Sequence, residues 1–262
     1  MGFAGRAYLV CCDARTGSSL LAGTLRSTGR AGRPYEYFSR AEIEKPWLRN
    51  DLLRVPADVP FTGFAGWRDY ILRSGSELGG VFAASVHYWQ FGDCVDAFRE
   101  DPAARPLDAL RAFFPQLRLV RLRRRNVVAQ AISHHVAIST NYWNSRMAVG
   151  KAAPGESDRD APYDFDRIDH QVTSALAVEQ GWSEALRGAE AITLPLAYEE
   201  LAADIQGAVR RLCAHVGIEL GDAPIAPGIE KQAGAWSLEM ERRYRRERQE
   251  RGLGPVGDEA AL

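Results

Sequence analysis

The sequence predicts an α/β protein with a mainly parallel central sheet flanked by helices. Short apolar, β-prone runs alternate along the chain with segments of helical periodicity, which is typical of successive strand–helix–strand units. The chain has 262 residues, of which 46% are hydrophobic and 26% charged, enough to bury one large core. We therefore expect a single domain over 1–262, with inserted segments at about 45–64 and 144–163 and a basic helix at about 229–251.

The first strand, loop and helix form the clearest local pattern. Ala7–Cys12 is an apolar run that predicts a strand, and residues 20–25 carry leucines at helical spacing. Between them, residues 13–19 (DARTGSS) form a short polar turn around one glycine. Turns of this kind hold phosphate groups at helix N-termini, so we expect a P-loop-like nucleotide site here.

The loop departs from the magnesium-nucleotide motif GxxxxGK[ST] at two positions. Cys12 stands where the first glycine belongs, and Ser18 stands where the lysine belongs. Without that lysine, ATP or GTP hydrolysis loses a main source of charge neutralisation. We expect instead a backbone cradle, with Arg15 beside it, for a phosphate-like group that reacts without a metal ion.

A carboxylate among aromatic residues follows the first helix. The turn at residues 28–34 leads into Tyr35-Glu36-Tyr37-Phe38, where Glu36 has three aromatic neighbours. Desolvation by these rings is expected to raise the pKa of Glu36, which suits a general base. A surface glutamate beside a hydrophobic contact is an equally good interpretation of this stretch alone.

The second strand is expected to end close to this carboxylate. A helix is predicted over 67–78 and a buried strand over 81–86. His87 and Trp89 fall just past the strand end, where ligand-binding side chains collect in open parallel sheets. A structural role for His87 remains the alternative.

An arginine cluster follows the third predicted strand. After a helix over 106–114, residues 117–122 alternate apolar and basic, as in a strand at or near a sheet edge. Arg123, Arg124 and Arg125 then precede a helical run over 127–133. Guanidinium groups and a helix N-terminus attract the same anion, so this junction is a second candidate phosphate site. A solvated basic corner is the alternative.

The last third of the chain continues the alternation. The predicted elements are a helix over 165–186, a strand over 191–196 and a helix from 198 to 217. A basic helix then carries Trp236, Met240 and Tyr244 at four-residue spacing. This stripe is expected to dock against the domain or a partner subunit, with the arginines solvated.

Composition excludes several classes of protein. A net charge of −1 and a pI near 6.5 do not fit a protein that binds nucleic acid over its whole surface. No run is long and apolar enough to predict a membrane span. Cys11 and Cys12 are adjacent within a strand, and Cys94 and Cys213 stand alone, so we expect neither a disulfide framework nor a zinc site. These features predict a cytoplasmic protein.

Several stretches resemble a known family. ARTGSSLL at 14–21 resembles the 5′-phosphosulfate loop of sulfotransferases that use 3′-phosphoadenosine 5′-phosphosulfate (PAPS). With AGRPYEYF at 31–38, the chain is similar to the bacterial family typified by mycobacterial trehalose 2-sulfotransferase. Further similar stretches, in this order along the chain, are 123–133, 163–165, 198–201 and 231–233 ahead of Trp236.

The resemblance implies roles for particular residues. The 5′-phosphosulfate would be held by Arg15, Thr16, Gly17, Ser18 and Ser19. The 3′-phosphate would be held by an arginine of the 123–125 cluster, Arg123 or Arg124 being our candidates, together with Ser133. Glu36 matches the family's proposed general base, and Arg15 would stabilise the departing phosphate. The products would be a sulfate ester and 3′,5′-adenosine diphosphate, and the enzyme would be a homodimer.

The acceptor side matches the family poorly. Candidate acceptor ligands are Arg33, Tyr37, Phe38, His87 and Trp89. Ser85 stands where relatives tend to have a lysine, which leaves the neutralisation of the transferred group open. We therefore expect a PAPS-dependent sulfotransferase acting on a trehalose-like carbohydrate or another small hydroxylated metabolite. The alternatives are an ATP-dependent small-molecule kinase on the same fold and a catalytically inactive nucleotide-binding protein.

Overall fold

The computed structural model describes residues 2–38, 63–77, 80–141, 143, 161–227 and 234–257. The expected insertion at 45–64 lies outside this part except for its last two residues. Of the expected segment at 144–163, only 161–163 are described. The single-domain organisation therefore stays a prediction.

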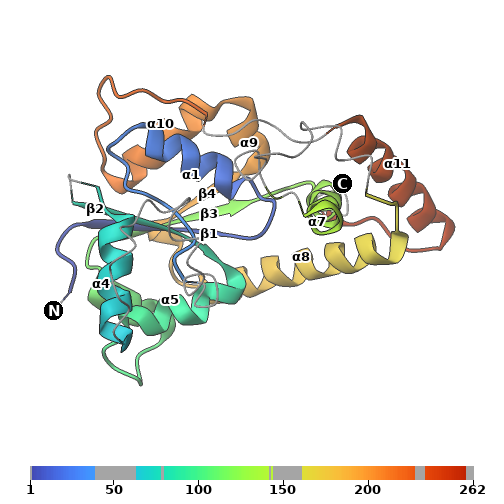
Figure 1. The fold of residues 1–262 in the computed structure, drawn as a ribbon. Helices are drawn as coiled ribbons and strands as arrows, with labels where there is room; N and C mark the ends of the chain where they lie inside the picture. The colour runs from blue at the N-terminus through green and yellow to red at the C-terminus, as the bar shows by residue number, and fades with distance from the viewer. Residues whose placement is uncertain are drawn as a thin grey trace.

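The centre of the molecule is a parallel sheet (Figure 1). In the described part of the chain its strands are β1 (Arg6–Cys12), β2 (Val81–His87), β3 (Leu117–Arg123) and β4 (Thr193–Ala197), in the order β2-β1-β3-β4. Each neighbouring pair is parallel, and Cys12 is in register with His87. The predicted fold class is confirmed, and the carboxyl ends of β1 and β2 lie at the same edge.

Helices cover both faces of the sheet. They are α1 (Ser18–Ser27), α4 (Gly63–Gly75), α5 (Phe91–Phe98), α6 (Pro106–Phe113), α9 (Tyr198–Ala203) and α10 (Ile205–Val216). Successive strand residues point to opposite faces, so β1 contributes Tyr8 and Val10 to one core and Ala7 and Leu9 to the other. The first core includes α1, α9 and α10, and the second includes α4, α5 and α6 (Figure 1).

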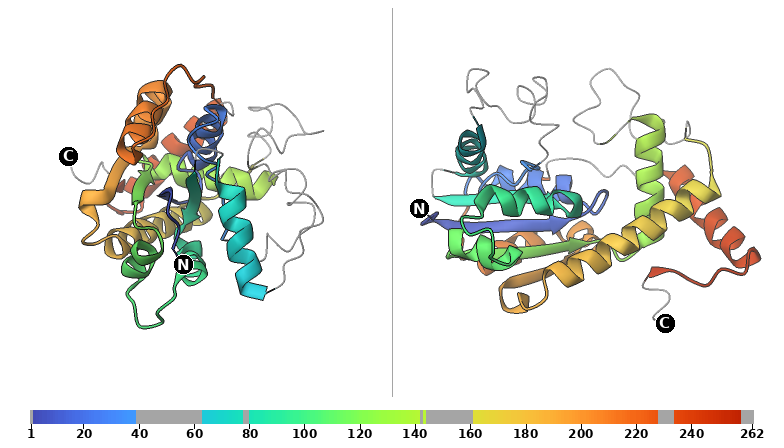
Figure 2. Two further views of the ribbon diagram at one scale, coloured as in Figure 1. Left: turned by 90° about the vertical axis from the view of Figure 1, so that its left-hand side faces the viewer. Right: turned by 90° about the horizontal axis from the view of Figure 1, so that it is seen from below.

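A third hydrophobic core lies beyond the sheet. It is shared by α7 (Val127–Thr140), α8 (Phe165–Ala185) and α11 (Ala235–Glu250). The long α8 extends from the sheet to α7 and α11 (Figure 2), so that its two ends belong to different cores. Met240 and Tyr244 are fully buried here, which confirms that the stripe on the basic helix docks against the domain.

Arg242, Arg243 and Arg246 of α11 are exposed, as predicted, whereas Arg245 and Arg248 are partly buried and form ion pairs. Arg245 pairs with Glu241, and Arg248 lies 2.5 Å from the Asp169 carboxylate on α8. Arg251, which directly follows α11, pairs with Asp166. The acidic residues of α8 are distant in sequence, so the basic pattern of α11 could not reveal them.

Other elements are shifted from their predicted bounds. His87 is the last residue of β2, and the one-turn helix η1 (Tyr88–Gln90) follows it. A second one-turn helix, η4 (Glu190–Ile192), precedes β4. β3 lies one strand in from the edge strand β4. The helix expected from 198 to 217 is two helices, because the Asp204 side chain accepts the Gly207 amide and caps α10.

None of the helices in the described ranges combines the length and apolar character needed to cross a membrane.

Candidate functional site

The loop between β1 and α1 has the shape expected of an anion site. Gly17 has φ +91°, and a Cβ atom there would lie 2.6 Å from the Tyr198 ring, so only glycine fits. Arg15 also has a positive φ, of 64°. Within the described residues no side chain caps α1, so the first backbone amides of this helix are open to a negative group.

The hydroxyl residues of the loop differ in their surroundings. The Thr16 side chain is buried, and its Oγ1 donates to the Asp13 carbonyl oxygen at 2.7 Å. Ser18 is buried at the start of α1, whereas Ser19 is exposed. Thr16 therefore stabilises the turn itself, and Ser18 and Ser19 lie at the helix N-terminus where an anion would bind.

Arg15 connects the two predicted phosphate sites. Its Nε donates to Ser133 Oγ on α7 at 2.9 Å, and its guanidinium also donates to the Trp143 carbonyl. The structure thus brings the first loop and Ser133 into direct contact.

The three arginines after β3 lie in different environments. Arg123 is exposed. Arg124 stacks on the Tyr198 ring at 4.6 Å and donates from Nη1 to the Arg15 carbonyl oxygen at 3.4 Å. Burial lowers the pKa of Arg124, opposed by Tyr198 and nearby acidic groups. Its Nε is buried with no hydrogen-bond partner in the described structure, while Arg125 pairs with Glu200.

The N-terminus of α7 is less open than the sequence pattern indicates. The Glu199 carboxylate accepts the backbone amides of Arg125 and Asn126, each at 3.1 Å. The Asn126 side chain accepts the Ala129 amide at 2.9 Å and so caps the helix. Protein groups therefore already occupy these amides, and the arginine side chains remain the groups able to bind a phosphate here.

Glu36 lies at the carboxyl end of β2. Residues 33–38 have no regular secondary structure and pass beside this strand, where the Ser85 amide donates to the Tyr35 carbonyl oxygen at 2.9 Å. This segment brings Glu36 Oε1 to 3.2 Å from His87 Nε2. The Glu36 side chain is 30% exposed and that of His87 10%. A partly accessible carboxylate thus stands at the same sheet edge as the loop after β1.

The expectation that Glu36 has a raised pKa is wrong. Burial alone would raise the pKa of Glu36, but the charge of His87 and a hydrogen bond from it outweigh burial and lower the pKa. For His87, burial alone would lower the pKa, but Cys12 and Glu36 beside it raise the pKa well above its ordinary value. The two groups therefore form a carboxylate–imidazolium pair at neutral pH.

Only two of the five candidate acceptor ligands lie near Glu36. The exposed Trp89 ring stands edge-on to His87 at 6.4 Å. Arg33 instead pairs with Glu77 near the amino end of β2. Tyr37 and Phe38 are buried in the core, and the Tyr37 hydroxyl lies within hydrogen-bond distance of two backbone carbonyl oxygens. We leave these three residues out of the candidate site for that reason.

Sequence reasoning missed two residues that shape the loop. Tyr198 packs between Gly17 and Arg124, and Gln130 reaches the loop from α7. A signal exists for Gln130, because it is a polar residue within the apolar run VVAQAI. Tyr198 directly follows a strand, at the sheet edge where ligand sites form.

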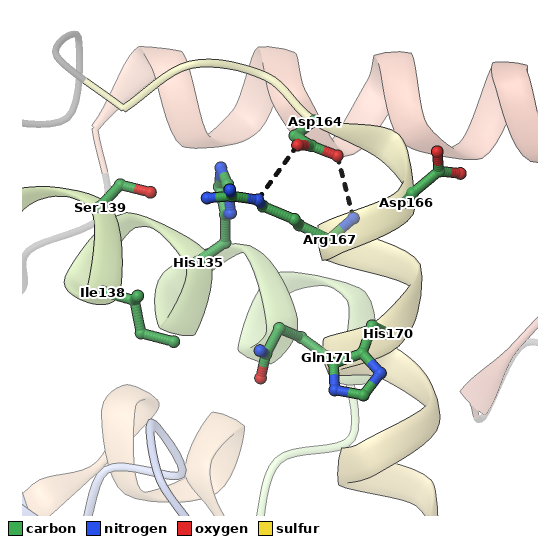
Figure 3. Close-up of a pocket in the computed structure, with 8 residues that line it drawn as sticks. All are labelled: His135, Ile138, Ser139, Asp164, Asp166, Arg167, His170 and Gln171. Atoms are coloured by element: carbon green, nitrogen blue, oxygen red, sulfur yellow. Dashed lines mark hydrogen bonds and ion pairs between the residues drawn. The ribbon is translucent and has the colours of Figure 1, made fainter.

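A pocket of about 380 Å³ lies between α7 and α8 (Figure 3). None of the predicted site residues lines it. Asp164 and Arg167 at its rim are paired with each other. The lining residues are His135, Ile138, Ser139, Asp164, Asp166, Arg167, His170 and Gln171.

The described ranges contain no group of three or more histidine, cysteine or acidic side chains arranged to hold a metal ion.

Comparisons with known proteins agree with one another. The family model described as Stf0 sulphotransferase matches residues 7–247 of the chain. A trehalose 2-sulfotransferase from Mycolicibacterium smegmatis (strain ATCC 700084 / mc(2)155) is 29% identical over 94% of this chain and 97% of its own length. The trehalose 2-sulfotransferase of Mycobacterium tuberculosis (strain ATCC 35801 / TMC 107 / Erdman) is also 29% identical, over 97% of this chain and 99% of its own length.

Two solved structures are similar at low identity. The sulfotransferase domain from the curacin biosynthetic pathway has a TM-score of 0.49 at 14% identity, covering 90% of this chain and 83% of that one. A sulfotransferase from Alicyclobacillus acidocaldarius has a TM-score of 0.46 at 15% identity, and the match covers 95% of this chain and 96% of that one.

Proposed function

The chain belongs to the Stf0 sulphotransferase family and is a sulfotransferase, and from this premise we propose that PAPS is its donor and a hydroxyl group its acceptor. The acceptor proposed is a trehalose-like carbohydrate or another small hydroxylated metabolite. Relatives named trehalose 2-sulfotransferase, aligned over nearly the whole chain, support a carbohydrate. The observation that carries the proposal is the Glu36–His87 pair, with Glu36 partly exposed, at the same sheet edge as the N-terminus of α1, which no side chain of the described residues caps.

In the proposed reaction Glu36 is the general base. It takes the proton of the acceptor hydroxyl as the oxygen attacks sulfur, and the bond between sulfur and the bridging phosphate oxygen breaks. The electron pair of that bond leaves with the 5′-phosphate of 3′,5′-adenosine diphosphate. Arg15 and the first amides of α1 stabilise the negative charge that develops there, and the proposal includes no metal ion.

The donor is proposed to lie across the carboxyl ends of β1 and β3. Residues 15–19 would bind the 5′-phosphosulfate, and Arg123 or Arg124 with Ser133 would bind the 3′-phosphate. The hydrogen bond between Arg15 and Ser133 supports this arrangement, because it joins the two sites. On the acceptor side, the exposed Trp89 ring beside His87 offers a face on which a sugar ring can stack.

We also propose a homodimer that works in the cytoplasm. The family resemblance supports the dimer, and the absence of paired cysteines among the described residues is in keeping with a reducing compartment. Light scattering after size-exclusion chromatography measures the oligomeric state, and fractionation of cells measures the location.

A donor screen tests the proposed function. PAPS and 3′,5′-adenosine diphosphate should each raise the melting temperature, since a ligand that binds the folded state stabilises it, whereas ATP with magnesium should not. Incubation with PAPS and a panel of hydroxylated acceptors that includes trehalose should release 3′,5′-adenosine diphosphate. Stabilisation by ATP alone would favour a kinase, and PAPS binding without release on any acceptor would favour an inactive binding protein.

A further inference from the structure

A buried glutamine on α7 is bonded to the loop between β1 and α1. Gln130 is 4% exposed, and its Nε2 donates to the Ala14 carbonyl oxygen at 3.0 Å. The same nitrogen lies 3.4 Å from Asp13 Oδ2. Its neighbours Val128, Ala131 and Ile132 are apolar core residues. An apolar side chain would fill this position without the cost of burying an amide, so packing alone does not explain the glutamine.

The bond to Gln130 is one of three that hold consecutive carbonyl groups of the loop. The Asp13 carbonyl accepts from Thr16, the Ala14 carbonyl from Gln130 and the Arg15 carbonyl from Arg124. Carbonyl oxygens repel an anion, and here each of them is engaged by a protein donor. The first amides of α1, which attract an anion, have no side-chain cap in the described structure.

Arg15 needs this support because its φ of 64° is unfavourable for a residue with a side chain. Its conformation persists only while the surroundings hold the loop on both sides of it. Gln130 holds the residue before it, and Arg124 holds the carbonyl of Arg15 itself.

We infer that Gln130 is a positioning residue that keeps the loop in the shape required for the 5′-phosphate of the donor. The inference rests on the proposed function. Without the amide donor, the Ala14 carbonyl loses its partner and Arg15 relaxes from its left-handed conformation. Part of the binding free energy of the donor is then spent on ordering the loop, so affinity falls while the acceptor side is untouched.

Two substitutions remove the donor with little change in volume. Gln130→Met leaves an apolar chain of similar length, and Gln130→Glu keeps the shape but cannot donate when ionised. For both we expect the Kd of 3′,5′-adenosine diphosphate, measured by titration calorimetry, to rise about tenfold, the size expected for one lost hydrogen bond. The KM for PAPS should rise in parallel, while the acceptor KM and the kcat at saturating PAPS stay within about twofold.

The Gln130→Glu variant adds a readout that a packing role would not move. The introduced carboxyl group would lie beside Asp13 and a carbonyl oxygen, which favours its protonated form, and that form can donate again. The ratio of its Kd to that of the wild type, taken at each pH, should therefore fall as the pH is lowered. For Gln130→Met the ratio should stay constant.

The matched control is Gln180→Met on α8, where the amide donates to Glu184 on the exposed side of the helix. Its Kd should equal that of the wild type. Circular dichroism establishes whether each variant is folded. If a variant does not fold, Gln130→Asn replaces it, because asparagine keeps an amide but is too short to reach Ala14. Folded Gln130 variants with wild-type Kd values would overturn the inference and leave the proposed function standing. A wild-type protein that binds no 3′,5′-adenosine diphosphate would overturn the proposed function instead.

Discussion

The role of Glu36 depends on one neighbouring side chain. Burial alone would raise the pKa of this carboxyl group and make it a stronger base. The positive charge of His87, 3.2 Å away, lowers the pKa instead. Glu36 is the more exposed member of the pair, so in the proposed reaction an acceptor hydroxyl would meet the carboxylate and not the imidazole. The proposed base is thus kept ionised at neutral pH by its ion pair with His87.

Replacing the carboxylate should separate binding from chemistry. Glu36→Gln keeps the shape and removes the base, so turnover should fall by about two to four orders of magnitude. The Kd of 3′,5′-adenosine diphosphate should stay close to the wild-type value, because the proposed nucleotide ligands lie on other elements. Steady-state rates and calorimetry measure the two effects. Unchanged turnover would require another base, for which His87 is the first alternative.

The pH dependence of the rate should report the His87 charge. A general base works when deprotonated, so kcat/KM should fall on acidification through the pKa of Glu36, which lies below its ordinary 4.5. His87→Gln removes the charge that lowers this pKa and leaves burial, which raises it. The acidic limb of the profile should therefore move to higher pH in the variant.

Rates for this comparison are taken only where circular dichroism shows folded protein. The control is Tyr88→Phe, at the residue that follows His87 but lies outside the ion pair. Its kcat/KM should fall at the same acidic pH as that of the wild type. An acidic limb that does not move in His87→Gln would mean that Glu36 is not the titrating base.

At the scale of elements, the strand–loop–helix at the N-terminus and the helix after the arginine cluster were predictable because each depends on neighbouring residues. The strand run, the single glycine and the helical leucines are local signals. The engagement of the α7 amides by Glu199 and the packing of Tyr198 on Gly17 join residues more than 70 positions apart. No local pattern reveals such contacts.

The difference between local and long-range contacts also explains why some acceptor ligands were predicted wrongly. The sequence places Tyr37 and Phe38 next to Glu36, but both rings are buried in the hydrophobic core, whereas the Glu36 side chain is partly exposed. The pKa of Glu36 was predicted in the wrong direction because its partner, His87, lies at the end of β2, about 50 residues later in the chain. Which side chains surround a charge is a property of the sheet and not of the local sequence.

The two arginines after β3 should have separable effects on nucleotide binding. Arg124 holds the Arg15 carbonyl, so Arg124→Ala should weaken both 3′,5′-adenosine diphosphate and 5′-AMP. Arg123 is exposed and is the other candidate ligand of the 3′-phosphate. If it binds the 3′-phosphate, Arg123→Ala should weaken 3′,5′-adenosine diphosphate by about tenfold to a hundredfold and leave 5′-AMP unchanged. Calorimetry with the two ligands measures the difference, and equal losses for both ligands in Arg123→Ala would contradict this division.

At the scale of the whole molecule, α8 joins the third core to the sheet, and α11 joins it to the start of α7, beside the proposed nucleotide site. α8 packs on the sheet at Trp182 and on α7 and α11 at Phe165. α11 reaches the start of α7, where Glu241 accepts from Asn126 Nδ2 at 2.9 Å and Arg245 donates to Asn126 Oδ1 at 3.1 Å. The cap of the helix that carries Ser133 therefore depends on a segment more than 100 residues later in the chain.

A substitution that creates a cavity at the docked face of α11 tests whether the start of α7 depends on α11. Met240 is fully buried between α11 and the helices α7 and α8, so Met240→Ala should lower the free energy of unfolding by about 2–5 kcal/mol, measured by urea denaturation. Leu238→Ala on the same helix is the matched control, since Leu238 is 54% exposed and its loss should cost at most about 0.5 kcal/mol. Because α11 also supplies Glu241 and Arg245 to Asn126, the Kd of 3′,5′-adenosine diphosphate should rise in Met240→Ala and not in Leu238→Ala. A destabilised variant with wild-type affinity would mean that α11 stabilises the fold without supporting the nucleotide side.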